Sequence, residues 1–470
     1  MKSLKIILSI LLLSLLSFLS NVSLAQHDHH HMSDSTKQDS KQDSLKMEMP
    51  DMNNSSKSEH HGPHVMNMDM AMSHSYSLSL PMNRNGSGTG WLPDASPMEG
   101  YMIHSNNWML MFHGNIFLRY TSANVNNRGK RGASMFDAPN WFMGMAQRKI
   151  GTDGLLNFGL MMSLDRLTER GDGYPLLFQS GETWEGRPLV DRQHPHDLFS
   201  ELSVAYTQRI NNDADVTAYF GLPGEPALGT AAFMHRVSSR NNPDAPLSHH
   251  WQDATHITFG VATLGARYKI FKIEGSIFSG REPDENRYNF DKPNFDSYSY
   301  RISMNPTSTF ALQFSQGFIK GPEALEPGVD VTRTTASVIH SYNFTKTRRL
   351  NTTIAWGMND KKNTGDDHKE HSLLLESNFE LNRINFYGRY EFVQKDPEEL
   401  SLTGFDHERK FNINALTLGS NYRIAKLKGV DVSLGAQGSL YFMPEDLEPF
   451  YGKSPLSAQV YIRLSPPFMD

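Results

Sequence analysis

The sequence predicts an all-β fold: a transmembrane antiparallel β-barrel of about 16 strands, preceded by a disordered N-terminal tail. Three observations support this prediction: an export signal at the start, alternation of apolar and polar residues from Asn107 onward, and alternating short and long connections. Beyond the signal, no stretch reaches the roughly 20 apolar residues of a membrane helix. Such a chain can span a membrane only as a closed barrel, in which the strands satisfy each other's backbone hydrogen bonds.

Residues 1–25 are typical of a secretory signal peptide. Two lysines precede an apolar run over residues 6–19. The sequence "SLA" provides small residues before the expected cleavage after Ala25. The chain of 470 residues has no cysteine and a formal charge of −6, which excludes disulfides, thiolate metal sites and a lipoprotein anchor on cysteine. It has no long basic run, so nucleic acid is not an expected partner. We therefore expect an exported protein of the cell outer membrane.

Residues 26–105 are predicted to form a disordered tail, because they are rich in polar residues and lack the alternation of a folded core. Eight histidines and nine methionines lie between His27 and Met82. Thioether sulfur suits Cu(I), whereas imidazole suits Cu(II), zinc and nickel. The barrel requires no cofactor, and the ions expected on the tail are copper, zinc or nickel. The alternatives are a solvated linker, or a plug that folds into the lumen. The candidate metal ligands of the tail are His27, His29, His30, His31, His60, His61, His64, Met66, Met68, Met70, Met72 and His74.

Sixteen later stretches repeat a polarity pattern of period two, as half-buried strands do. In the first, Leu110 and Phe112 face one way, whereas Met111 and His113 face the other. An even count returns both termini of the chain to the same side of the membrane. The predicted strands are residues 107–121, 138–149, 154–164, 198–210, 214–221, 255–268, 269–280, 296–305, 308–318, 332–344, 348–359, 370–381, 383–394, 411–424, 430–443 and 454–465.

The connections between these strands alternate in length. Short links such as "KIGTDG" and "NPTST" alternate with long links, of which residues 165–197 and 222–254 are the longest. Short periplasmic turns and long external loops are typical of outer-membrane barrels. Aromatic residues such as Tyr120 and Trp356 fall near strand ends, as interface girdles do. We therefore expect residues 106–470 to form the barrel, with the tail in the periplasm.

The signal peptide, the alternating strands and the terminal "SAQVYIRL" resemble a bacterial outer-membrane porin-like β-barrel over residues 105–470. The resemblance implies outer-membrane lipid and the barrel assembly machinery as partners, and metal ions or small polar solutes as cargo. The end "SPPFMD" departs from it, since such barrels commonly finish on an aromatic residue. The segments "HPHDLFSELSVAY", "GEPALGTAAFMHR" and "HHWQDATHITFG" are similar to a poorly characterised group of envelope proteins linked with metal efflux. That likeness implies periplasmic metal-efflux components as partners.

Two long loops carry the candidate ligands of the barrel. In an extended His-Pro-His, the imidazoles of His194 and His196 would face the same way, and "GREPDENR" adds carboxylates such as Glu282. Groups on neighbouring strand tops can converge on a metal ion or a polar constriction. The alternative is a set of hydrogen bonds that holds the loops across the mouth. The candidates are His194, His196, Asp197, His235, His249, His250, Asp253 and His256, the last of which we expect at the start of a strand.

The leading functional hypothesis is a porin-like channel whose periplasmic tail binds copper-type ions, for metal handling or small-solute passage. The alternative is a non-transporting metal-binding or surface-interaction barrel with a closed lumen. Met109, Met111 and His113 would project into the lumen, either as further ligands or as adaptable filler. Enzymatic activity is not expected, because Ser200 would face lipid and no Gly-x-Ser-x-Gly elbow is present.

Overall fold

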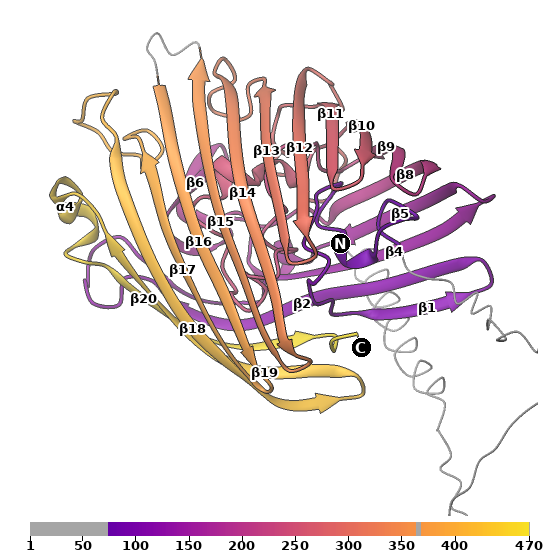
Figure 1. Cartoon of the computed structure of the whole chain (residues 1–470). Helices are drawn as coiled ribbons and strands as arrows, with labels where there is room; N and C mark the ends of the chain where they lie inside the picture. Colours follow the sequence, from indigo (N-terminus) through magenta and orange to yellow (C-terminus); the bar gives the residue numbers. More distant parts are fainter. Residues whose placement is uncertain (1–73, 363–367, 470) are drawn as a thin grey trace, which may run out of the picture. The chain divides into compact units, whose positions relative to one another are not determined.

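Sixteen antiparallel strands close into a barrel in the computed structural model, which describes residues 74–362 and 368–469 (Figure 1). Neighbouring strands along the chain pair around the ring, and β2 closes it by pairing with β20. The barrel strands are β2 (Trp108–Ser122), β4 (Asn140–Ile150), β5 (Gly154–Met162), β8 (Phe199–Asn211), β9 (Ala214–Gly221), β10 (Val261–Tyr268), β11 (Phe271–Phe278), β12 (Ser297–Thr307), β13 (Phe310–Ile319), β14 (Asp330–Thr345), β15 (Arg348–Lys362), β16 (His368–Leu381), β17 (Ile384–Lys395), β18 (Phe411–Leu427), β19 (Val430–Phe442) and β20 (Leu456–Ser465).

Each predicted strand is confirmed, and one boundary is wrong by several residues. Strand β10 begins at Val261, whereas the sequence predicted a start at residue 255. The residues before it form the short helices α3 (His249–Gln252) and η3 (Ala254–His256). His256 therefore lies in a helical turn before the strand. Its ring nitrogen Nδ1 lies 2.9 Å from the backbone oxygen of Asp253 in the same turn.

Several shorter elements accompany the barrel. Strand β1 (Tyr101–Ser105) pairs with the start of β2, and β3 (Ser134–Asp137) pairs with its end. The connection from β5 to β8 contains α2 (Asp165–Thr168) and the hairpin of β6 (Tyr174–Trp184) and β7 (Arg187–Gln193). Among residues 74–362 and 368–469, no helix is both long enough and apolar enough to cross a bilayer. The remaining described helices are η2 (Met82–Arg84), η4 (Glu445–Leu447) and α4 (Glu448–Tyr451).

The two faces of the barrel wall differ as the alternation predicts. Leu264, Ile273 and Leu418 point outward and are 63%, 59% and 60% exposed. The inward positions hold buried polar residues such as Arg301 and Ser315, at 1% and 0% exposure. An apolar outer band around a polar interior is the pattern of an outer-membrane barrel, because the lipid side can offer no hydrogen bonds. The protein is therefore located in the outer membrane.

The expected tail boundary near residue 105 is wrong, because residues 74–105 belong to the same unit as the barrel. The backbone N–H of His74 donates to Oε1 of Gln147 at 3.2 Å, and the Gln147 amide donates back to the His74 carbonyl at 2.5 Å. Further along, the Leu92 carbonyl accepts a hydrogen bond from Asn305 at 2.8 Å. Side chains of the barrel wall thus supply partners to a segment that has no periodic pattern of its own. The other tail candidates, from His27 to Met72, lie outside the described residues.

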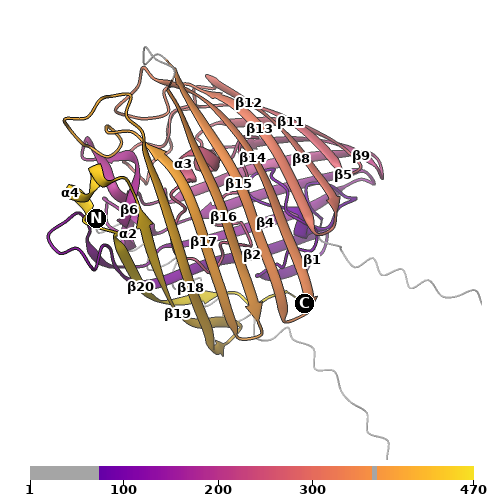
Figure 2. The same ribbon diagram turned by 60° about the vertical axis from the view of Figure 1, so that its left-hand side comes forward.

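The connection between β9 and β10 folds inside the barrel, and we call residues 222–260 the lumen loop. Its Gly229 N–H donates to Ser315 on β13 at 2.8 Å, and its Ser238 hydroxyl donates to Glu376 on β16 at 2.9 Å. Its Asp244 accepts a hydrogen bond from Gln459 on β20 at 2.8 Å. Helix α3 of this loop lies against β14, β15 and β16 (Figure 2). The lumen loop is therefore tied to several sides of the wall.

Candidate metal centre

Five buried histidines gather where the lumen loop meets the segment before β8. The ring centroids of His249 and His256 lie 5.0 Å apart, and those of His196 and His256 lie 5.5 Å apart. His249 is 5.4 Å from His250, which in turn is 6.1 Å from His194. All five side chains are buried. We call His194, His196, His249, His250 and His256 the histidine cluster.

The Nδ1 atoms of this cluster face oxygen acceptors. The Nδ1 of His196 lies 2.6 Å from Oδ2 of Asp165, and that of His249 lies 2.7 Å from Oδ1 of Asp253. The Nδ1 of His194 lies 3.1 Å from Oε1 of Glu182. A neutral imidazole that donates from Nδ1 keeps a lone pair on Nε2. The contacts therefore favour the tautomer in which Nε2 is the free ligand atom.

Three histidines of the cluster have an Nε2 atom without a hydrogen-bond partner. The Nε2 atoms of His196, His250 and His256 are buried and have no hydrogen-bond partner. An unpaired polar atom away from water costs about 1–3 kcal/mol. A histidine whose Nδ1–H is held by a carboxylate or carbonyl, with Nε2 free, is the usual arrangement of a metal ligand. The cluster therefore has the donor atoms and the supporting contacts of a nitrogen-ligand metal site.

Burial favours the neutral form of three rings in the cluster, those of His194, His250 and His256. It lowers the pKa of His194 and His250 well below the usual value, with the charges of neighbouring Arg287 and His249, respectively, acting in the same direction. It also lowers the pKa of His256, where His249 adds to the effect. Metal ions bind the neutral imidazole and must displace any proton. These rings therefore need no deprotonation near neutral pH.

The two aspartates that the sequence proposed as ligands take supporting roles. Asp197 accepts a hydrogen bond from Arg287 at 3.2 Å, and burial raises its pKa to about 7 although Arg287 opposes this. Burial also acts to raise the pKa of Asp253, but Arg236 and His249 hold it well below its usual range. Both carboxylates thus face cationic or N–H groups of the protein.

His235, which the sequence grouped with these residues, belongs to a different set of side chains. Its ring lies 5.7 Å from His113 and 5.1 Å from Trp141 between centroids. Burial lowers its pKa to about 4. The expected lipid-facing position of Ser200 is also wrong, since Ser200 is buried and its hydroxyl donates to the Asp197 carbonyl at 3.1 Å.

Asp165 and Glu182 support the site but were not predicted. Asp165 lies on α2, and Glu182 lies on β6, which forms a hairpin with β7. Neither residue stands in a recognisable motif. The only available signal was the excess of charged residues in the long connection of residues 165–197. Their proximity to the histidines depends on how that connection folds back toward the lumen.

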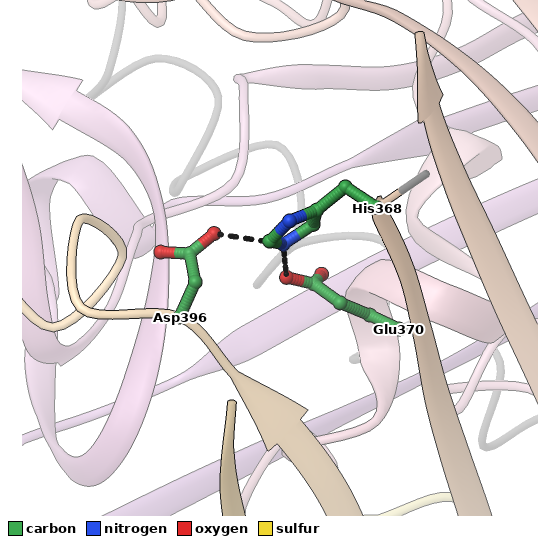
Figure 3. Close-up of side chains that lie close together, drawn as sticks. All are labelled: His368, Glu370 and Asp396. Carbon is green, nitrogen blue, oxygen red and sulfur yellow. Dashed lines mark hydrogen bonds and ion pairs between the residues drawn. The ribbon is translucent and has the colours of Figure 1, made fainter. Parts of the chain in front are cut away.

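Among the described residues, one group has three ligand atoms within 4.8 Å of one another, and it lies outside the histidine cluster: His368, Glu370 and Asp396 (Figure 3). The Nε2 of His368 lies 3.0 Å from Oε1 of Glu370 and 3.7 Å from Oδ2 of Asp396. The ammonium of Lys361 lies 3.3 Å and 2.9 Å from the same two oxygens. Because a lysine already provides the balancing cation, this group is an ion-pair cluster that joins β15, β16 and the end of β17.

No protein-family model matches the chain. No curated protein sequence matches it either. Among solved structures, it is similar to an anion-selective porin from Comamonas acidovorans, with 10% identity over 76% of this chain and 99% of that chain, at a TM-score of 0.48. It is also similar to OmpF of Salmonella typhi, solved in complex with daunomycin, with 11% identity over 78% and 100% of the two chains and a TM-score of 0.48.

A third similar structure is a loop-deletion mutant of OmpT, an outer-membrane protein of Vibrio cholerae, with 9% identity, 77% and 100% coverage and a TM-score of 0.46. At these identities and TM-scores, the similarities say nothing about shared activity. The closed ring of sixteen strands and its apolar outer band define the fold of this chain as an antiparallel outer-membrane β-barrel.

Proposed function

We propose that this protein is a metal-handling outer-membrane barrel whose histidine cluster binds a Zn(II)- or Cu(II)-type ion. The observation that carries the proposal is the set of three buried Nε2 atoms without partners, on His196, His250 and His256. Imidazole nitrogen suits Cu(II), zinc and nickel, whereas magnesium and calcium prefer oxygen. The histidine- and methionine-rich tail would add further ligands on the periplasmic side, where metal-efflux components are its proposed partners.

The cluster has room for one ion, but its rings must move to enclose it. A cavity of about 10 Å³ is bordered by His194, His196, His250 and His256. That volume corresponds to about one water-sized sphere. No three ligand atoms of the cluster lie within 4.8 Å of one another in the described structure. Binding would therefore require side-chain rotations that turn the Nε2 atoms toward this cavity.

The test is Zn(II) and Cu(II) titration of the folded full-length protein in detergent, read by calorimetry. A His196→Ala/His256→Ala double variant should lose one tight binding equivalent. His407→Ala is the matched control, because its side chain is 88% exposed and pairs only with Glu398 among the described residues. The tail is present in all three proteins and contributes equally. An unchanged stoichiometry and affinity in the double variant would overturn the proposal.

A second candidate function is restricted passage of small polar solutes. Sixteen strands leave room for an aqueous lumen. The lumen loop crosses that space, which favours low conductance over the free diffusion of a general channel. Single-channel recording in planar bilayers distinguishes the two functions: small, steady open currents support restricted passage, whereas the absence of any current supports a closed metal-binding barrel.

A further inference from the structure

A second cavity, of about 110 Å³, lies on the inner side of β2 and β4 and is rich in methionine. Six of its 20 lining residues are methionines, in a chain that has 24 methionines among 470 residues. We call it the methionine cavity. Its methionines are Met82, Met98, Met111, Met143, Met145 and Met234.

These methionines come from separate parts of the chain. Met82 lies on η2, Met145 lies on β4, and Met234 lies on the lumen loop. Met82 and Met111 are 3% and 4% exposed and pack in one cluster with Met98 and Met145. Simple filling of space would be served equally by leucine or isoleucine, which have no sulfur. Recurrence of the same residue from five segments therefore points to the thioether groups themselves.

Two histidines complete the donor set. His113 and His235 both line the cavity, with ring centroids 5.7 Å apart. Each ring packs on Trp141, at 5.2 Å and 5.1 Å between centroids. The Nε2 of His113 is buried and has no hydrogen-bond partner. This nitrogen is therefore available to a ligand in the cavity.

The charges around the cavity are balanced before any ion enters. Three arginines border it, and each has a carboxylate partner. Arg463 pairs with Glu99 at 2.6 Å, Arg236 pairs with Asp253 at 2.6 Å, and Arg240 pairs with Glu380. The remaining donors are uncharged: thioether sulfurs, histidine nitrogens and the amides of Asn85 and Asn115. Such a set accommodates a monovalent cation at lower cost than a divalent one, because no anionic ligand offsets the second charge.

We infer that the methionine cavity is a binding site for a soft monovalent cation, Cu(I) or Ag(I), held by thioether sulfurs and by Nε2 of His113. Thioether ligands select Cu(I) among the copper, zinc and nickel ions. The site deepens the proposed metal-handling function but uses different ligands from the histidine cluster. A smaller cavity of about 50 Å³ borders both, because it is lined by His196 of the cluster and by Trp141 and Met234 of the methionine cavity.

The test uses the folded full-length protein in detergent, labelled with ¹³C at the methionine methyl groups, and Ag(I) as the probe. Met111→Leu and Met145→Leu assign two cavity signals by their disappearance. Both signals should shift on titration with Ag(I). His113→Ala removes a direct ligand, so it should weaken the affinity reported by these two signals by at least the roughly tenfold that loss of an outer-shell partner costs. A Met111→Leu/Met145→Leu variant conserves volume and should reduce Ag(I) stoichiometry.

Two controls separate this site from the rest of the protein. Met443 packs against a different cluster of buried residues, so its signal should stay unchanged. His256→Ala removes a member of the histidine cluster and should leave the Met111 and Met145 shifts intact. If the tail methionines shift while Met111 and Met145 do not, the inference is overturned and the proposed function stands. If the cavity signals shift but the histidine cluster binds no Zn(II) or Cu(II), the proposed function fails and the inference stands.

Discussion

The Nδ1 atom of His196 lies 2.6 Å from Oδ2 of Asp165, and both side chains are buried. The contact joins the segment before β8 to helix α2, across 31 positions of sequence. The other carboxylate oxygen of Asp165 accepts the backbone N–H of Asn140 at 2.8 Å. Asp165 therefore fixes both the ring orientation and the tautomer of a histidine whose Nε2 has no partner.

Asp165→Asn should weaken Zn(II) and Cu(II) binding by about 10–100-fold. Both oxygens of Asp165 accept hydrogen bonds, whereas asparagine has one oxygen, so either His196 or Asn140 would face an amide N–H. Calorimetry on the folded full-length variant measures the change. Asp153→Asn is the matched control, since Asp153 pairs with Arg209 at a partly exposed turn. Equal loss of affinity in both variants would contradict a supporting role for Asp165.

Asp244→Ala should increase single-channel conductance by loosening the lumen loop. Asp244 lies within 2.8 Å of donors on three residues of the wall, namely Arg119, Gln437 and Gln459. Its removal deletes one set of contacts from the loop to β2, β19 and β20 at once. Asp446→Ala, at an exposed pair with Arg409, should leave the conductance unchanged. Identical current traces for the wild type and Asp244→Ala would show that this anchor does not hold the lumen closed.

An arginine on the outer face should destabilise the barrel in a depth-dependent way. Leu418 and Leu427 lie on the same strand, β18, and are similarly exposed at 60% and 61%. Leu418 is near the middle of the strand, so Leu418→Arg should cost about 2–4 kcal/mol, whereas Leu427→Arg at the end should cost about 0–1 kcal/mol. Urea-dependent folding into lipid vesicles measures both. Equal costs would contradict the membrane position of β18.

Because of Glu225, the free energy of unfolding should decrease as the pH rises. It is buried in the lumen loop, and burial raises its pKa from 4.5 to about 8. Between these two values the unfolded chain loses the proton while the folded protein retains it, so the free energy of unfolding decreases with pH. Glu225→Gln cannot ionise and should show a smaller decrease between pH 5 and pH 8. Urea unfolding in detergent at both pH values measures the difference.

Glu408→Gln is the control for this pH effect, because Glu408 is exposed. It should reproduce the wild-type dependence on pH. A Glu225→Gln variant with the same slope as the wild type would show that Glu225 is already ionised in the folded protein at pH 5.

Much of the candidate centre could be read from the sequence. The segments "HPHD" and "HHWQDATH" contain all five histidines that the structure brings together. The supporting carboxylates Asp165 and Glu182 could not be identified, because nothing in their local pattern distinguishes them from other charged loop residues. His235 was assigned to the wrong group, since its position in the lumen loop does not reveal which wall its side chain meets.

The sequence by itself determined the sixteen strands and their lipid-facing side. The two-residue alternation that places Leu416 and Leu418 on the outer face arises from backbone geometry between near neighbours, so it is visible without the rest of the fold. Only the tertiary structure decided that residues 74–105 join the barrel and that the lumen loop crosses it. These segments have no period of their own. Their positions depend on hydrogen bonds to wall residues that are distant in the chain, such as Gln147 for His74.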